Sequence, residues 1–472
     1  MYGRPPQVNS EMCIRIKHRS ELFAFTNQDQ HCLRHPNLHI MLELTVERGE
    51  PSFVPPAEET QRGLYYLSNI DQNTAMTVPT LYGFKHNDKG NEKAAEVIKN
   101  ALSRILVHYY PLAGRMALDT EGKLTVDCTG EGAVFVEAQA NASLEMLGDL
   151  GKPDFSVLKL LLCDIVDPRM ILEIPPLMVQ VTKFECGGFV VGLYTNHCIL
   201  DGFGAMQFMN SWSETARGLP LEINPYLDRS VLKPRNPPKI DFPHHEFDQI
   251  EDISNTINLD KEGLIHKSFI FDPEQLKQLK IKVMEDGNLA KCSSFETLVA
   301  LTWKMRTKAL SLHPNQRIKL LFPVDGRSRF DPPIPHGYFG NCVVFTYVIS
   351  SAGEITKNPL SSIVRLVQEA ICKVTDKYIR SVIDYMELNR LQPSLTATLL
   401  ISSWCKLPFD TTDFGWGVPH VSGLASLAES KEIVMFLAHG SDRKSINVLV
   451  SLPASAMKIF EELMTDVELW LP

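Results

Sequence analysis

The sequence lacks the residue spacings that mark metal, redox and membrane proteins. Its ten cysteines are scattered over 472 residues. None forms a C-x-x-C pair, and no cysteine and histidine cluster has zinc-ligand spacing. No stretch approaches the roughly 20 apolar residues of a membrane helix, and the N-terminus carries no apolar signal-peptide core. We therefore expect a protein of the reducing cytoplasm with no transmembrane segment, no bound metal and no permanently bound cofactor.

An excess of positive charge and a nucleotide-binding loop are also missing. Lysine and arginine number 47 against 56 acidic residues, for a formal net charge of −9. The basic stripe of a nucleic-acid-binding protein is absent, so no nucleic acid partner is expected. The Gly-x-Gly at residues 129–132 lacks a third glycine and opens no helix, which predicts a turn. Asp413-Phe414-Gly415 occurs without the other protein-kinase motifs, so it does not indicate a kinase.

Length and proline placement predict a division into two halves. A chain of 472 residues with 44% hydrophobic residues can form two or three cores. Prolines punctuate residues 219–260, which is typical of a semi-rigid connector. We predict an N-terminal domain over residues 1–224, a crossover over 225–258 and a C-terminal domain over 259–472.

Helical and strand-like patterns occur in both halves. Residues 90–106 carry an apolar stripe at i, i+3, i+4 spacing, which predicts an amphipathic helix. Asp272-Pro273 and Ser293 or Ser294 with Glu296 are helix start signals. Strands are expected at residues 124–128, 134–138, 266–271, 318–324, 342–349, 432–437 and 446–451, and a closing helix from Ala454. The mixture indicates an α/β or α+β fold.

The most informative stretch runs from Asn196 to Gly202. It follows the apolar run 188–194 and precedes a helical pattern at 205–212, so His197 is expected at a strand end. A histidine titrates near neutral pH and could take a proton from a hydroxyl there. Asp201 would share a face with His197 only in a helix, so it could equally hold the turn or orient the ring. Cys198 would point to the opposite strand face, which disfavours a covalent thiol route.

Three motifs appear in order along the chain. They are His197 with Asp201-Gly202, Tyr338-Phe339-Gly340-Asn341, and Asp413-Phe414-Gly415-Trp416-Gly417. Together with the segment from Tyr110 to Arg115, they resemble the plant BAHD acyl-CoA-dependent acyltransferases over nearly the whole chain. Residues 67–73, 127–138 and 236–247 resemble the subgroup that acts on ω-hydroxy fatty acids and fatty alcohols in suberin and cutin assembly.

The resemblance implies a fold and a reaction. The fold would be two chloramphenicol-acetyltransferase-like domains, each a mixed sheet flanked by helices, with a channel between them. Acyl-CoA as co-substrate and an alcohol acceptor would meet at His197, the general base, in a monomer. A feruloyl-type hydroxycinnamoyl group would pass from CoA to an ω-hydroxy fatty acid or long-chain fatty alcohol. No metal is needed, because a thiol leaves readily.

The resemblance also assigns site residues. Asp201 would pair with Arg327, near Gly202, and the loop containing Asp413, Gly415 and Gly417 would be structural. Trp416 could donate to the oxyanion or face the channel. CoA-binding residues would be Ser293, Ser294, Asp325, Tyr338, Gly340 and Asn341. Lys406 would lie on the acceptor side, where relatives that acylate shikimate or quinate carry arginine.

Three other functions remain open at this stage. Lysine at 406 keeps a positive charge but loses the bidentate fork of arginine, which weakens a shikimate or quinate acceptor without excluding it. A condensation-type domain acting on carrier-protein thioesters would have a second histidine where Asn196 stands. A non-catalytic scaffold of the same family would not need His197 and Gly202 intact.

Overall fold

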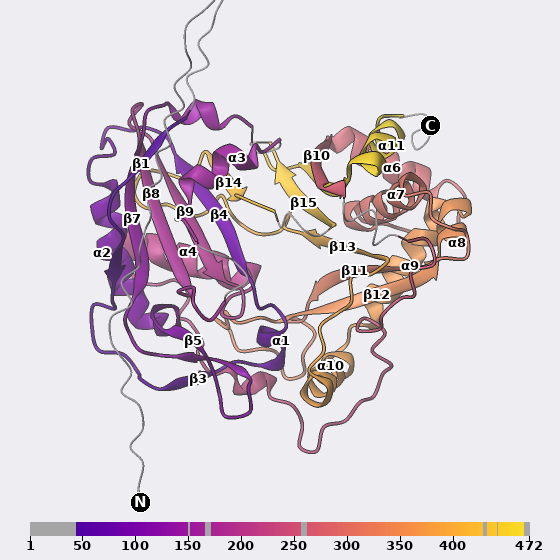
Figure 1. Ribbon diagram of the computed structural model, residues 1–472, viewed down its shortest axis with the longest axis horizontal. Coiled ribbons are helices and arrows are strands. Elements are labelled where there is room, and N and C mark those ends of the chain that lie inside the picture. The colour runs from indigo at the N-terminus through magenta and orange to yellow at the C-terminus, as the bar shows by residue number, and fades with distance from the viewer. Residues whose placement is uncertain are drawn as a thin grey trace, which may run out of the picture. The chain divides into compact units, whose positions relative to one another are not determined.

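The computed structural model describes residues 44–149, 152–165, 171–255, 262–427, 432–440 and 442–466 (Figure 1). Residues 1–43, with which the predicted first domain begins, lie outside this part of the chain. So do residues 467–472, with which the predicted second domain ends.

The strands form three sheets. The seven-stranded sheet contains β1 (Val46–Arg48), β2 (Ser52–Val54), β4 (Thr77–Phe84), β7 (Ala133–Ala140), β8 (Leu177–Phe184), β9 (Phe189–Asn196) and β14 (Val421–Leu424). The six-stranded sheet contains β10 (Leu264–Phe271), β11 (Arg317–Asp325), β12 (Val343–Ser351), β13 (Thr398–Ser403), β15 (Ile433–His439) and β16 (Ser445–Pro453). A small sheet contains β3 (Leu64–Tyr66), β5 (Arg115–Leu118) and β6 (Leu124–Asp127).

The α-helices are α1 (Asn69–Gln72), α2 (Ala94–His108), α3 (Phe155–Leu158), α4 (Gly202–Ala216), α6 (Pro273–Met284), α7 (Ser294–Ala309), α8 (Ala352–Lys357), α9 (Leu360–Lys373), α10 (Asp376–Asn389) and α11 (Ala454–Thr465). Short 3-10 helices are η1 (Tyr110–Ala113), η2 (Leu144–Leu147), η3 (Lys159–Leu161) and η4 (Arg229–Leu232).

Both large sheets are mixed, as the predicted fold class requires. In the first, β7 pairs parallel with β8, and the other pairings are antiparallel. In the second, β13 pairs parallel with both β11 and β15. Strand β14 follows the crossover in sequence but pairs antiparallel with β4, so the C-terminal half contributes an edge strand to the first sheet.

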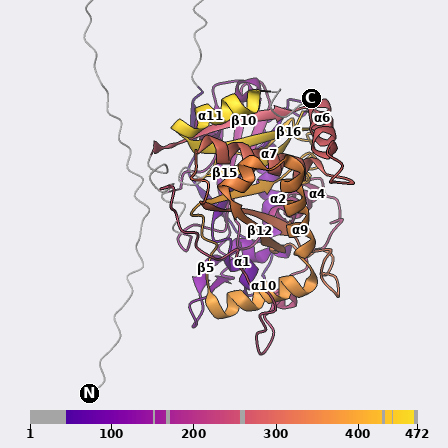
Figure 2. The same cartoon turned by 90° about the vertical axis from the view of Figure 1, so that its right-hand side faces the viewer.

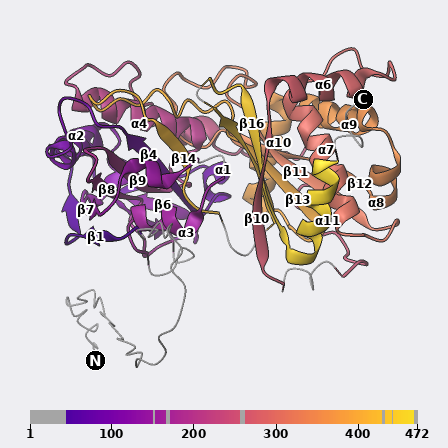
Figure 3. The same cartoon turned by 90° about the horizontal axis from the view of Figure 1, so that it is seen from above.

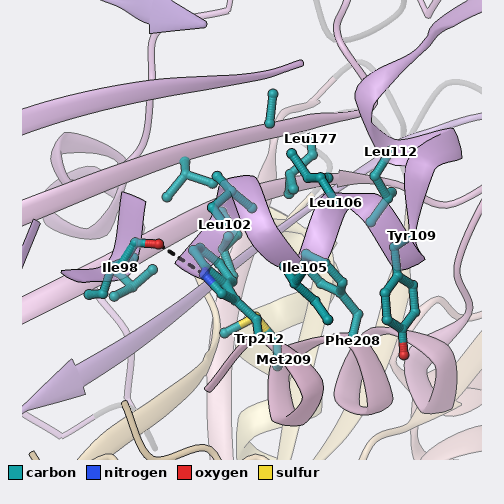
Figure 4. Packing of buried hydrophobic residues seen from close by; sticks show 14 of the residues in the cluster. Ile98, Leu102, Ile105, Leu106, Tyr109, Leu112, Leu177, Phe208, Met209 and Trp212 are labelled. Atoms are coloured by element: carbon teal, nitrogen blue, oxygen red, sulfur yellow. Dashed lines mark hydrogen bonds between the residues drawn. The ribbon is translucent and has the colours of Figure 1, made fainter. Parts of the chain in front are cut away.

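Helices cover these sheets through apolar faces. In the second half, α6, α7, α9 and α11 gather on one side of the six-stranded sheet (Figure 3) and share a buried core with it. In the first half, α2 packs against α4 (Figure 4). The indole Nε1–H of buried Trp212 on α4 donates to the Ile98 carbonyl on α2 at 3.0 Å, which ties the two helices together.

Most of the local predictions are confirmed. The helix predicted at 90–106 is α2, and it starts four residues later, after an N-cap residue, Lys93, whose side chain makes no capping bond. Helices α6 and α7 begin at the predicted signals, with capping boxes of Asp272 with Gln275 and of Ser293 with Glu296. Each predicted strand has a counterpart, with ends that differ by at most two residues.

Residues 235–248 of the predicted crossover are bonded to the second half. The Arg235 guanidinium donates to Asp384 of α10 at 2.6 Å. The buried Lys319 ammonium donates to the carbonyls of Glu246 and Asp248, at 3.0 and 2.8 Å. Helix α10 lies apart from α7 and α9 and beside α1 (Figure 2). These described residues of the crossover therefore pack against the second half and do not form an unattached linker.

Candidate active site

His197 follows directly after β9, at the position that the sequence predicts. Its backbone N–H donates to the Met76 carbonyl at 2.9 Å, which anchors the residue to the segment before β4. A turn over residues 197–199 follows, and α4 begins at Gly202. The His197 side chain is partly buried. The imidazole is thus presented by a rigid strand and turn.

Asn341 determines which imidazole nitrogen can act as a base. The Asn341 amide Nδ2 donates to the His197 carbonyl at 2.7 Å and to Asp71 Oδ1 at 3.0 Å, and both of these oxygens can only accept. The amide Oδ1 therefore faces the His197 ring, 3.0 Å from Nδ1. Because an amide oxygen accepts, Nδ1 must carry the proton. Within the described residues nothing bonds Nε2, whose lone pair is free to accept a proton.

Asp201 bonds to Arg327 and to the start of α4, and it makes no bond to the imidazole. The two terminal nitrogens of Arg327 donate to the two Asp201 oxygens at 2.8 Å each. Asp201 is also the N-cap of α4 and accepts from the Gly204 N–H at 2.9 Å. Burial lowers and the Asp201 charge raises the pKa of Arg327, with a net rise. The alternative that the sequence left open, orientation of the ring by Asp201, has no bond to support it.

Four residues assigned to CoA from the resemblance lie at the end of β11 and in the segment that precedes β12. Asp325 ends β11 and accepts from the Arg327 backbone N–H and side chain, both at 3.1 Å. Tyr338 is buried, and burial raises the pKa of its phenol. Gly340 packs so closely on Arg229 that a Cβ there would lie 2.5 Å from the guanidinium. Asn341 is fully buried and bonded inside the protein.

Cys198 lies in the turn after β9 and not in the strand, contrary to the sequence-based expectation. The residue belongs to the turn over residues 197–199, ahead of Asp201-Gly202, where the sequence predicted the turn. Its side chain is fully buried in the first-half core. Burial raises the pKa of the Cys198 thiol to about 12. Thiolate is scarce at neutral pH in such a site, which disfavours a covalent thiol route.

The loop from Asp413 to Gly417 is a compact turn against the first half. Asp413 accepts from the backbone N–H groups of Gly415 and Gly417, at 2.7 and 2.9 Å. Both glycines have positive φ, +102° and +87°, where side chains are disfavoured. The Trp416 indole N–H donates to the Gly90 carbonyl at 2.6 Å. An indole has only this one donor, so Trp416 would have to give up that bond to donate to an oxyanion.

The remaining assigned residues lie on other elements. Ser293 is the N-cap of α7 and Ser294 is its first residue, and no contact in the described chain joins either serine to His197. Lys406 is exposed in the turn after β13 and forms no ion pair with any described residue. Gly202 opens α4 against Leu407, where a Cβ would lie 2.7 Å from a leucine methyl. Of the assigned residues, Asn341 is thus the one that bonds to the His197 ring, and Asp201, paired with Arg327, lies at the start of the helix that follows.

Two residues of the site were missed from the sequence. Asp71 and Arg229 form an ion pair at 2.6 Å with side-chain exposures of 0% and 1%. Asp71 also accepts from the Asn341 backbone N–H at 2.9 Å. A local signal for Asp71 existed, because Ser68-x-x-Asp71 is a capping-box pattern. Nothing local points to Arg229.

Two further features of the described residues concern membrane-spanning helices and metal binding. No helix of the described residues is long and apolar enough to cross a membrane. No group of three or more histidine, cysteine or acidic side chains in that part of the chain is arranged to hold a metal ion.

Comparison with known proteins shows that this chain is similar to transferases. Residues 44–467 match the Transferase family. The chain is 54% identical to omega-hydroxypalmitate O-feruloyl transferase of Arabidopsis thaliana, over 93% of this chain and 96% of that protein. It is 55% identical to fatty alcohol:caffeoyl-CoA acyltransferase of Arabidopsis thaliana, over 89% and 98%.

The fold is shared with a solved structure. The crystal structure of vinorine synthase superposes with a TM-score of 0.70 at 23% identity, over 90% of this chain and 98% of that one. This confirms the predicted fold class of chloramphenicol-acetyltransferase-like halves with mixed sheets and flanking helices. The chain therefore belongs to the Transferase family, as a member of the BAHD acyl-CoA-dependent acyltransferases that its motifs resemble.

Proposed function

We propose that this enzyme transfers a hydroxycinnamoyl group of the feruloyl type from CoA to the hydroxyl of an ω-hydroxy fatty acid or long-chain fatty alcohol. Such a product belongs to suberin or cutin-type polyester or to wax. The two relatives at 54% and 55% identity support this, because their names pair a feruloyl or caffeoyl group with a long aliphatic acceptor. The observation that carries the chemistry is the free Nε2 lone pair of His197, imposed by Asn341.

The proposed reaction needs only one proton carrier. His197 Nε2 takes the acceptor's hydroxyl proton while the alcohol oxygen attacks the thioester carbonyl, which becomes a tetrahedral oxyanion. The oxyanion collapses, the C–S bond breaks and the ester remains. The CoA sulfur leaves with the bonding electrons and takes the proton from the imidazolium. A positioned base of this kind contributes about 10²–10⁴-fold.

Several parts of this proposal concern substrate placement. CoA would bind beside Ser293, Ser294 and Asp325, in a channel between the halves 1–224 and 259–472. Tyr338, Gly340 and Asn341, assigned to CoA from the resemblance, would act from beneath the site, because Tyr338 and Asn341 are buried. The oxyanion donor would be Trp416 after release of Gly90, or a hydroxyl of the channel.

Burial of a long acceptor chain predicts how KM should depend on the length of that chain. Each buried methylene contributes about 0.8 kcal/mol, so KM should fall about fourfold per added methylene until the channel is filled, while kcat changes less. The test uses purified full-length protein with feruloyl-CoA and caffeoyl-CoA, a homologous series of primary alcohols, and release of free thiol as the readout. Shikimate and quinate are assayed in parallel.

The alternative acceptor is a shikimate- or quinate-type alcohol. It would be favoured by thiol release with shikimate exceeding that with every long alcohol, or by no dependence on chain length. Lys406 argues against it, because an exposed ammonium lacks the bidentate geometry that clamps a carboxylate. A Lys406→Arg variant should leave the long-alcohol activity within about threefold, since an aliphatic chain offers nothing to clamp.

Location and assembly are part of the same proposal. We propose that the enzyme acts in the cytoplasm and as a monomer. The cysteines of the described residues are all free thiols, which a reducing compartment preserves. Light scattering of the purified protein tests the monomer, and a dimer mass would contradict it.

A further inference from the structure

The buried Asp71 carboxylate controls the orientation of Asn341, and through it the His197 tautomer. Its Oδ1 accepts from the Asn341 backbone N–H at 2.9 Å and from the side-chain Nδ2 at 3.0 Å. A carboxylate accepts only, so the amide must turn its nitrogen toward Asp71 and its oxygen toward His197. A flipped amide would set oxygen against carboxylate and nitrogen against Nδ1.

The Asp71 carboxylate is itself fixed by hydrogen bonds to both of its oxygens. Its Oδ2 accepts from the Ser68 backbone N–H and hydroxyl at 2.8 Å each, within a capping box. Its Oδ1 also accepts from the Arg229 guanidinium at 2.6 Å. With the two bonds from Asn341, five donors converge on one carboxylate that is 0% exposed. Such a saturated acceptor has no freedom to rotate.

Arg229 links this carboxylate to the turn that carries the base. Its second terminal nitrogen donates to the Ile199 carbonyl at 2.6 Å, two residues after His197. The guanidinium also lies over the rings of Tyr65 and Phe339, at 5.4 and 5.1 Å. Burial lowers and the Asp71 charge raises the pKa of Arg229, with a net rise, so it stays charged.

We propose that Asp71 and Arg229 are positioning residues of the transfer reaction, which lock His197 in the Nδ1–H tautomer through Asn341. The inference rests on the proposed role of His197 as the base. Neither residue touches substrate. Their loss therefore acts on kcat, because a ring with the proton on Nε2 cannot accept one from the alcohol. In another enzyme, neutralising the carboxylate that sets a catalytic tautomer lowers kcat about 10⁴-fold.

The direct test is Asp71→Asn in the full-length enzyme. An asparagine can present its amide nitrogen to Asn341, so the Asn341 amide loses one of the two acceptors that fix its direction and keeps only the His197 carbonyl. We expect kcat with feruloyl-CoA and a long alcohol to fall at least about 10²-fold, with KM within about threefold. A second readout is the ¹⁵N NMR spectrum of histidine-labelled protein, in which His197→Ala identifies the His197 signals. The Nε2 signal should move from the unprotonated toward the protonated position.

Asp71→Asn leaves the Arg229 charge buried without a partner, which can unfold the protein. The double variant Asp71→Asn with Arg229→Met removes both charges and should fold, with the same loss of kcat and the same NMR change. The matched control is Glu432→Gln, in the buried pair with Arg306 at 2.6 Å, which has side-chain exposures of 3% and 11%. It should lower Tm without changing kcat or the His197 signals.

Two results would overturn the inference. One is a folded Asp71 variant with kcat within about threefold of wild type, and the other is an unchanged His197 tautomer in that variant. The NMR readout requires no turnover. The NMR spectrum therefore tests the positioning roles of Asp71 and Arg229 even if the proposed long-chain acceptor is wrong. Wild-type activity in His197→Ala would instead refute the proposed role of His197 as the base.

Discussion

Replacing Asp201 by asparagine separates a structural carboxylate from one that orients the base. Asp201 accepts four bonds: two from Arg327 at 2.8 Å, one from the Gly204 N–H at 2.9 Å and one from the Cys342 N–H at 3.1 Å. None comes from His197. Asparagine keeps the size and can still cap α4, but it loses the charge and one acceptor that face Arg327.

The expected loss of stability follows from the burial of the pair. Removing one partner of a fully buried ion pair costs about 3–5 kcal/mol. The Asp201 side chain is 1% exposed, but that of Arg327 is 21% exposed. Arg327 also keeps Asp325 and the Gly340 carbonyl as acceptors. The lower end, about 3 kcal/mol, therefore applies, and with the usual unfolding entropy per residue it lowers Tm by about 3 °C.

The assay combines thermal unfolding with thiol release at a temperature where both proteins are folded. We expect kcat of Asp201→Asn to remain within about threefold of wild type while Tm falls. Asp325→Asn is the matched control, because it faces the same arginine but its side chain is 35% exposed, and it should cost under about 1 kcal/mol. An unchanged Tm with kcat reduced by about 10⁴-fold would refute the reasoning, since that is the signature of a carboxylate that orients a histidine.

Three further outcomes are expected. His197→Ala should lose at least about 10²-fold in turnover while circular dichroism shows a folded protein, and near-normal turnover would disprove a base at this position. Cys198→Ala should keep turnover within about threefold, and iodoacetamide should not inactivate the native enzyme, because burial raises the pKa of the Cys198 thiol to about 12. Burial also lowers the pKa of Lys319 to about 8, despite the opposing charges of Asp248 and Glu246. From pH 8 toward the unfolded lysine's value of about 10.4, the unfolded chain binds more protons, so this group makes stability rise with pH. Urea midpoints of Lys319→Met should lack that rise relative to wild type, and parallel pH curves for the two proteins would contradict it.

Local signals were sufficient where neighbours in sequence decide the structure. The caps at Asp272 and Ser293 start helices as predicted, because a capping box involves residues only three apart. The strand end at His197 could also be predicted from neighbouring residues, because an apolar run followed by Asp-Gly predicts a strand and then a turn. The predicted start of α2 was four residues too early, because no capping residue marks the observed start in the sequence.

The acyltransferase class and the candidate base were thus determined by the sequence alone, through ordered motifs and one strand-end histidine. The tertiary structure decided what each polar partner does. Asn341 and Asp71 lie 144 and 126 positions from His197; Asn341 meets the His197 ring, and Asp71 meets Asn341, only when the halves fold together. Strand β14 joins the first sheet by pairing with β4, which no local pattern encodes. Periodicity reports contacts within a few residues, whereas the tautomer that we propose for His197 depends on a chain of bonds through three distant segments.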